Sequence, residues 1–222
     1  MVAAGKGRRS GLGINKVFFR FGSKLLIEQT LENICGCPEI RAVVVVLNQA
    51  DLRRHASGLR KKFVKIRDIV TGGKERRDSV MNGLRSAEKF SPRGKVLIHD
   101  AARPFVNRRI VRDCLRKVGK GRGAVPGLAV TDTLKRVKNG LVQRTIDRAG
   151  LVEVQTPQAF ILKDIMAAFR RYGDKPATDD CQVFESWGGK IAVIEGSVLN
   201  FKVTYPGDFE LYKALVRYLW DK

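Results

Sequence analysis

Two glycine-rich stretches carry the backbone amides and cations that could hold a phosphate. The first, AAGKGRRSG, spans residues 3–11 and is followed by Lys16, and the second, TGGKERRDSV, spans 71–80. Glycine turns expose N–H groups that can face an anion, and neighbouring Arg and Lys side chains add positive charge. Neither stretch has the Walker A or G-x-G-x-x-G spacing. From these residues alone, a basic flexible N-terminus is an equal alternative for the first stretch.

A single acid and three cations complete the set of residues suited to phosphate chemistry. Asp100 ends the apolar run KVLIHD, and Arg103 follows it. A carboxylate at a strand end suits Mg²⁺ when a triphosphate supplies the other oxygens, and the alternatives are a helix cap or an ion pair with Arg103. Arg148 in IDRAGL and Lys202 in NFKVT are lone cations in apolar surroundings. Such residues are more often edge positions with solvated heads, but beside phosphate-type loops they favour a phosphate clamp.

The elements that must position these residues alternate along the chain. Short apolar runs predict strands at 42–47, 65–70, 95–100 and 190–196. Helical periodicity predicts helices at 24–35, 51–63, 78–90, 108–120, 163–173, 179–188 and 206–222, with Asp78 or Ser79 as the candidate cap of the third. This alternation predicts an α/β fold, a Rossmann-like, mostly parallel sheet with helices on both faces. Ligands of such sheets bind beyond the carboxyl ends of the strands, where Asp100 is expected.

Residues 123–160 break the alternation with several strand-like pieces. The segment VKNGLV places Asn139 and Gly140 between apolar residues, which is a strong hairpin signal. We therefore expect a protruding antiparallel β-arm at about 131–155 on a single domain that spans 1–222.

The composition predicts anionic partners. The 222 residues carry a net charge of +21, which favours nucleotides, phosphorylated metabolites or nucleic acid. No apolar run approaches the ~20 residues that cross a bilayer, and no apolar signal-peptide core follows the basic N-terminus, so a cytoplasmic protein is expected. The four cysteines are few and scattered, which favours reduced, mostly buried thiols over a metal site.

Eight motifs in order resemble one family. AAGKGRR followed by a lysine, GGKERRDSV, HDAARPF, VTDTLKR, IDRAGL, QTPQAF, ATDD and NFKVT together resemble the 2-C-methyl-D-erythritol 4-phosphate cytidylyltransferases over nearly the whole chain. The resemblance implies transfer of a cytidylyl group from CTP to 2-C-methyl-D-erythritol 4-phosphate, with release of pyrophosphate, in the non-mevalonate route to isoprenoid precursors. It also implies Mg²⁺ and a homodimer in which each arm completes the partner's site.

The resemblance further implies a role for each matched residue. Arg9 and Lys16 would be catalytic, stabilising the transition state. Asp100 would contact both the nucleotide and Mg²⁺. The nucleotide would be bound by Ala3, Ala4, Gly5, Lys6, Gly7, Gly72, Gly73, Ser79, Asp100 and Ala101. The methylerythritol phosphate would be bound by Arg103, Thr133, Arg148, Thr156, Thr178 and Lys202.

The implied chemistry agrees with the residues present. A phosphate monoester has a second pKa near ~6 and is largely dianionic at pH 7, so it attacks without a general base. Fixed cations must instead hold the charge that builds on the α-phosphate.

Three departures from the family pattern and three other readings accompany this interpretation. Asn15 stands where proline is common, Ser10 stands where methionine is usual, and only Met1 and Val2 precede AAG, so we expect a shortened first strand. Either an upstream start or another segment would fill the gap. The alternatives are a ribitol-5-phosphate cytidylyltransferase, a basic RNA-binding protein on the same fold, and an inactive scaffold. Against RNA binding, VFFRF at 17–21 is the nearest aromatic–basic run and is better explained as core.

Overall fold

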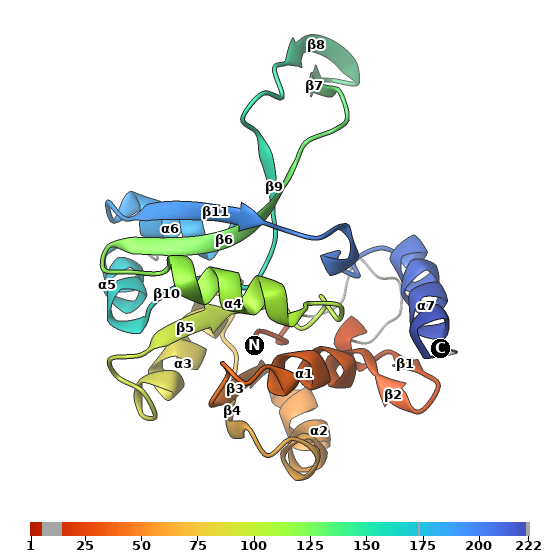
Figure 1. Ribbon diagram of the computed structural model, residues 1–222, viewed down its shortest axis with the longest axis vertical. Coiled ribbons are helices and arrows are strands. Elements are labelled where there is room, and N and C mark those ends of the chain that lie inside the picture. The colour runs from red at the N-terminus through yellow and green to blue at the C-terminus, as the bar shows by residue number, and fades with distance from the viewer. Residues whose placement is uncertain (6–14, 173, 221–222) are drawn as a thin grey trace.

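The protein is an α/β molecule with an arm that projects from its body (Figure 1). The structure is a computed structural model that describes residues 1–5, 15–172 and 174–220. The helices are α1 (Leu26–Gly36), α2 (Gln49–Lys62), α3 (Arg76–Glu88), α4 (Arg108–Lys117), α5 (Leu162–Tyr172), α6 (Asp180–Ser186) and α7 (Pro206–Trp220). Short 3₁₀ turns lie at Lys16–Phe18 and Val198–Asn200. None of the helices in the described part of the chain is long and apolar enough to cross a membrane.

The strands form a body sheet in two parts. One part is β3 (Val43–Leu47) parallel to β4 (Ile66–Thr71). The other has the order β11-β6-β10-β5, with β9 also paired to β6. Its strands are β5 (Lys95–Ile98), β6 (Arg122–Ala129), β9 (Val152–Val154), β10 (Gln158–Ile161) and β11 (Lys190–Glu195). The pair β6–β11 is parallel, whereas β10 runs antiparallel to both β5 and β6.

The first residues of the chain join the two parts. Val2 forms parallel bridges to Val46 of β3 and to Asp100 beyond β5. Its N–H donates to the His99 carbonyl at 2.8 Å, and its carbonyl accepts from the Ala101 N–H at 3.0 Å. Met1 to Ala3 therefore act as a central strand segment that bridges the two parts.

Helices cover both faces, as the sequence predicts. One core cluster includes buried side chains of α1, α4 and α7, and the other includes those of α3, α5 and α6. The predicted apolar face of α1 is buried in the first cluster, because Leu26, Ile27, Leu31 and Ile34 all recur on one side of the helix. The four cysteines are free, and three of them are buried, which confirms the interpretation as packed thiols.

The arm is a β-hairpin of β7 (Leu134–Lys138) and β8 (Leu141–Ile146). Asn139 and Gly140 at its tip have φ angles of 51° and 78°. Both lie in the left-handed region that a tight hairpin turn requires, which confirms the Asn-Gly prediction. A smaller hairpin, β1 (Arg20–Phe21) and β2 (Lys24–Leu25), precedes α1.

Candidate active site

A cavity of about 540 Å³ lies at the carboxyl ends of the central strands. The start of the chain, the 3₁₀ turn at Lys16–Phe18, the loop between β4 and α3, and the segments after β5 and before α7 all border it. Of the residues predicted from the sequence, the cavity is lined by Ala3, Ala4, Gly5, Lys16, Gly73, Ser79, Asp100 and Lys202. Segments up to about 200 residues apart in the chain thus meet at the edge of the sheet where parallel strands bind ligands.

The two glycine loops touch through Gly72. A Cβ atom at this position would lie 2.5 Å from the Ala4 Cβ and 2.6 Å from the Ser79 Oγ, so only glycine allows this approach. The Gly73 N–H donates to the Ser79 Oγ at 3.1 Å, and that hydroxyl donates to the Glu75 carbonyl at 3.2 Å. The second loop is therefore held against the first by packing and by a side chain at the start of α3.

The start of α3 differs from the sequence prediction. The helix begins at Arg76 rather than at 78, with Glu75 as its N-cap residue. The Asp78 carboxylate accepts a hydrogen bond from the Glu75 N–H at 3.0 Å. The proposed cap at Asp78 or Ser79 is therefore wrong. Asp78 instead lies inside the first turn and reaches back to the cap backbone, as the third residue of a capping box does.

Asp100 lies between two cations. The Lys202 Nζ is 2.6 Å from one carboxylate oxygen, and the Arg76 Nη2 is 3.6 Å from the other. Burial opposes ionisation of Asp100, but Lys202 and Arg76 outweigh it and hold the pKa of this carboxyl well below its usual range. Asp100 is thus a carboxylate at neutral pH, facing a cavity lined by cations.

Arg76 connects Asp100 to a second carboxylate that sequence reasoning missed. Its guanidinium donates to both oxygens of Asp180, at 2.7 and 2.8 Å, in a two-point ion pair. The Asp180 side chain is 1% exposed, and the Gln158 side-chain oxygen accepts hydrogen bonds from the N–H groups of Asp180 and Cys181. The motifs GGKERRDSV and ATDD contain both partners, but no local pattern reveals a pair that is 104 residues apart.

Thr156 supports Asp100 from below the cavity. The Asp100 N–H donates to the Thr156 hydroxyl at 3.1 Å, and this hydroxyl is 3.0 Å from the Nδ1 of His99. Burial lowers the pKa of His99 to about 4, so the ring is neutral at pH 7 and its Nδ1 accepts the hydroxyl proton. The Nε2–H then donates to the Arg103 carbonyl at 3.2 Å. Thr156 is buried, and its described contacts position Asp100.

Asn15 holds the two ends of the first glycine loop together. Its Nδ2 donates to the Ala3 carbonyl at 2.7 Å and to an Asp51 carboxylate oxygen at 2.8 Å. It also begins the turn that contains Lys16, which lines the cavity. Asn15, which stands where proline is common in the family, therefore supplies two anchoring hydrogen bonds. The predicted residues Lys6, Gly7 and Arg9 lie outside the described part of the chain.

Ala101 and Arg103, like Gly72 and Thr156, lie next to the cavity without lining it. Ala101 is fully buried, and its carbonyl accepts a hydrogen bond from the Thr30 hydroxyl at 2.8 Å. The Arg103 guanidinium donates to the Asn200 carbonyl at 2.8 Å, which ties the segment after β5 to the segment before Lys202.

Three predicted substrate-binding residues lie away from this cavity within one chain. Thr133 and Arg148 are exposed at the base of the arm, where the Arg148 guanidinium donates to the Thr131 carbonyl. Thr178 is exposed before α6, and its hydroxyl donates to the Gln182 side chain at 3.1 Å. The structure of a single chain thus groups the described nucleotide residues with Lys202, whereas Thr133, Arg148 and Thr178 do not line the cavity.

The fold and the cavity define a class of protein. A Rossmann-like sheet with a glycine-lined, cation-rich cavity at its carboxyl edge is typical of nucleotide-binding α/β proteins. The family of 2-C-methyl-D-erythritol 4-phosphate cytidylyltransferases matches residues 1–218, and the chain belongs to this family.

Two kinds of relative, which differ in length, are similar in sequence to this chain. The chain is 37% identical over 217 residues to the 2-C-methyl-D-erythritol 4-phosphate cytidylyltransferase of Halalkalibacterium halodurans, covering 96% of this chain and 94% of that protein. It is 36% identical to the bifunctional enzyme IspD/IspF of Rhodospirillum rubrum, covering 98% of this chain. The chain spans about half the length of that bifunctional relative, 56%.

Solved structures agree with the fold. The 2-C-methyl-D-erythritol 4-phosphate cytidylyltransferase of Thermus thermophilus superposes with a TM-score of 0.78 at 31% identity, covering 97% of each chain. The 4-diphosphocytidyl-2C-methyl-D-erythritol synthase of Anaerococcus prevotii superposes with a TM-score of 0.82 at 28% identity, covering 97% of this chain and 93% of that one. The predicted Rossmann-like fold is confirmed.

Proposed function

We propose that this protein transfers a cytidylyl group from CTP to 2-C-methyl-D-erythritol 4-phosphate and releases pyrophosphate. The observation that carries the proposal is the single cavity in which Lys16, Lys202 and Arg76 converge with Asp100 on the glycine loops. Family membership supplies the identity of the substrates, since the related enzymes bear their names.

The cavity suits a reaction that joins two anions. The attacking phosphate is a dianion near neutral pH, so the site needs cations rather than a base. His99 is neutral, buried and hydrogen-bonded on both ring nitrogens, which makes it a poor candidate for proton transfer. Lys16 and Lys202 would instead hold phosphate oxygens and stabilise the charge that develops at the α-phosphate.

Mg²⁺ is the metal that we propose for this site. Mg²⁺ is usually bound by one or two carboxylates, with phosphates and waters as the remaining ligands, so the single ionised Asp100 fits this role. Lys202 would have to release the Asp100 oxygen that it now contacts at 2.6 Å. When bound, the metal would neutralise phosphate charge. In the described residues no group of three or more His, Cys, Asp or Glu side chains is placed to hold a metal by itself.

A homodimer with exchanged arms is also part of the proposal. The arm carries exposed apolar side chains, with Val137 56%, Leu141 69% and Val142 60% exposed. Such residues on a protruding hairpin favour contact with another protein surface. A partner's arm would bring Thr133 and Arg148 to a cavity that, within one chain, contains Lys202 but neither of them. A cytoplasmic location fits the four free thiols.

Pyrophosphate release tests the reaction directly. The purified full chain is supplied with CTP, Mg²⁺ and 2-C-methyl-D-erythritol 4-phosphate. In a parallel assay, ribitol 5-phosphate replaces the 2-C-methyl-D-erythritol 4-phosphate. We expect release with the methylerythritol substrate only, loss of release with EDTA, and a ~10²–10³-fold slower rate for Lys202→Ala. Lys213→Ala on α7 is the matched control and should leave the rate unchanged. Release with ribitol 5-phosphate instead would contradict the proposal.

A further inference from the structure

A cluster of cations lies at the amino ends of β5, β6 and β11, at the opposite edge of the sheet from the proposed active site. We name it the amino edge and define it by the exposed side chains of Arg93, Lys95, Arg116, Lys117, Lys120, Arg122, Lys163 and Lys190. The starts of β6 and β11 meet there, at the end of the body that carries α5 and α6 (Figure 1). None of these cations lines the cavity that contains Asp100.

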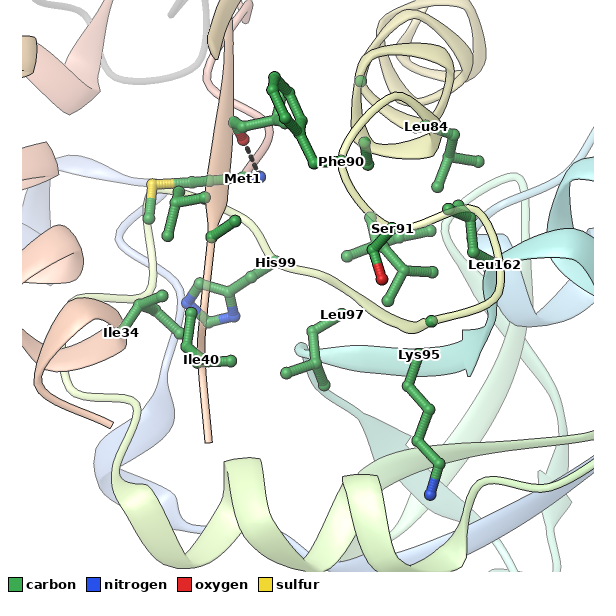
Figure 2. A pocket seen from close by; sticks show the side chains of 18 of the residues that line it. Met1, Ile34, Ile40, Leu84, Phe90, Ser91, Lys95, Leu97, His99 and Leu162 are labelled. Carbon is green, nitrogen blue, oxygen red and sulfur yellow. Dashed lines mark hydrogen bonds between the residues drawn. The ribbon is translucent and has the colours of Figure 1, made fainter. Parts of the chain in front are cut away.

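Contacts between distant segments bring these cations together. Arg122 and Lys190 are direct neighbours on β6 and β11, and the Arg122 Nε donates to the Lys117 carbonyl at 2.9 Å. The Lys95 Nζ donates to the Leu115 carbonyl at 2.7 Å, and Figure 2 shows this side chain extending from β5 toward α4. The end of α4 and the starts of three strands therefore form one continuous cationic surface.

The charge of the amino edge is almost unopposed. Within two residues of any of these cations in the sequence, Asp164 beside Lys163 is the only acid. Its carboxylate accepts a hydrogen bond from the Gly121 N–H at 3.0 Å, which brings the start of α5 to the turn before β6. None of the cations of the amino edge forms an ion pair with a residue that the structure describes.

The first half of α4 has the opposite arrangement. Arg108 pairs with Glu39 at 3.0 Å, and Arg112 pairs with Asp113 at 3.2 Å. Arg116 lies four residues after Arg112 on the same side of the helix, but it has no acidic partner among the described residues. Like charges that are not neutralised repel one another and oppose the compact state. A bound anion at the amino edge would remove this repulsion.

The chemistry of the surface fits the phosphate backbone of a double helix. Each exposed large hydrophobic side chain of the described residues lies at least three positions away in the sequence from these cations. A protein interface has an apolar centre, and a helix that lies on a membrane inserts apolar side chains, so both partners fit less well. Single strands are bound by stacking on aromatic rings, which the amino edge does not supply. Phosphates of a duplex require cations alone.

We propose that the amino edge binds the phosphate backbone of a double-stranded nucleic acid without reading its sequence. Arginine can hold a phosphate with two N–H groups, and lysine acts as a point charge. Lys95 begins β5, and Asp100 follows the end of this strand five residues later, ~16 Å along the chain. A duplex at the amino edge therefore leaves the cavity open. Double-stranded RNA and double-stranded DNA share this chemistry.

Fluorescence anisotropy with labelled duplexes of about 20 base pairs, one of RNA and one of DNA, tests the proposal on the full chain. The amino-edge variant combines Arg116→Gln, Lys117→Gln, Lys120→Gln and Lys163→Gln. The matched control removes the same charge from exposed residues of α2 and β4, with Arg53→Gln, Arg54→Gln, Lys61→Gln and Arg67→Gln. We expect at least ~30-fold weaker binding and a smaller salt dependence for the amino-edge variant, and less than ~3-fold weaker binding for the control.

The remaining outcomes are decisive in either direction. Both variants should melt within ~2 °C of the parent chain, because exposed substitutions change stability little. Tighter binding of either duplex than of its single strands supports the proposal. Equal loss in the two variants would show attraction by net charge alone and would overturn it, as would equal affinity for single strands. Vesicles that contain phosphatidylserine form a further arm. If the amino-edge variant lost vesicle binding but kept duplex binding, the surface would belong to a membrane instead.

Discussion

The body cavity and the arm both carry cationic side chains, but Lys202 and Arg76 in the cavity are held in ion pairs, whereas Arg148 on the arm is exposed. In the cavity, Lys202, Asp100 and Arg76 are linked in one continuous set of ion pairs that ends at buried Asp180. On the arm, Arg148 and Thr133 are exposed, and the Arg148 guanidinium donates to the backbone carbonyl of Thr131. The difference teaches that one chain preorganises the cations of its cavity but not the cation of its arm.

The largest expected effect comes from two separate variants, one altered in the arm and the other in the cavity. Arg148→Ala and Lys202→Ala should each slow pyrophosphate release by ~10²–10³-fold. If arms are exchanged, a refolded equimolar mixture contains heterodimers with one intact site of two, and recovers about a quarter of the activity.

A mixture that stays inactive would show that the arm serves its own chain, and would overturn the exchange. Arg144→Ala provides the matched control, because Arg144 is an exposed arginine on the same hairpin. It should leave the rate and the complementation unchanged.

A smaller effect is expected where the ion pairs of the cavity end. Asp180→Asn leaves the Arg76 guanidinium with Asp100 as its remaining carboxylate, so Arg76 should move closer to Asp100 and compete with Mg²⁺ and Lys202 for its oxygens. We expect a ~10–100-fold lower rate, a higher Mg²⁺ requirement and ~2 kcal/mol lower stability to denaturant. Asp113→Asn, at an exposed ion pair on α4, should change none of these. An unaltered Mg²⁺ requirement would contradict the link between Asp180 and Asp100.

The smallest effect concerns the Met1 amine, which donates to the Val44 carbonyl at 2.7 Å. Burial lowers its pKa to about 6 from a usual value near 8, so between these values the unfolded chain binds more protons than the folded one. Stability should therefore rise with pH between about 6 and 8. An N-acetylated chain has no such group, so its melting temperature should be flatter over this window. Parallel curves for the two forms would argue against burial of the charge. His99 is present in both forms, so its contribution to the pH dependence cancels in the comparison.

Local patterns predicted most elements of the fold, because they depend on neighbouring residues. The apolar run at 42–47 became Val43–Leu47, and the helical pattern at 51–63 became Gln49–Lys62. The hairpin turn at Asn139 and Gly140 was likewise predicted from neighbouring residues alone. The glycine loops, Asp100 and Lys202 were also predicted from motifs, and they meet in one cavity.

The remaining features depend on contacts between distant residues. The Arg76–Asp180 pair joins the starts of α3 and α6, and nothing within either helix specifies the other. The Thr156 hydroxyl was predicted to face a substrate, but its bonding to Asp100 and His99 follows from the packing of segments 56 and 57 residues apart. The start of α3 was misplaced because Asp78 serves a capping box just as well as a cap.

The bridge formed by Met1 to Ala3 gives an unusual importance to the beginning of the chain. Fraying of a terminal residue is ordinarily silent, since few contacts depend on it. Here, opening at Val2 would break the hydrogen bonds to His99 and Ala101 at the edge of the proposed active site, and would loosen Ala3 from Val46. Local unfolding at these residues and distortion of the proposed active site would then be one event. A change at residues 1 to 3 would therefore affect the proposed active site as well as folding.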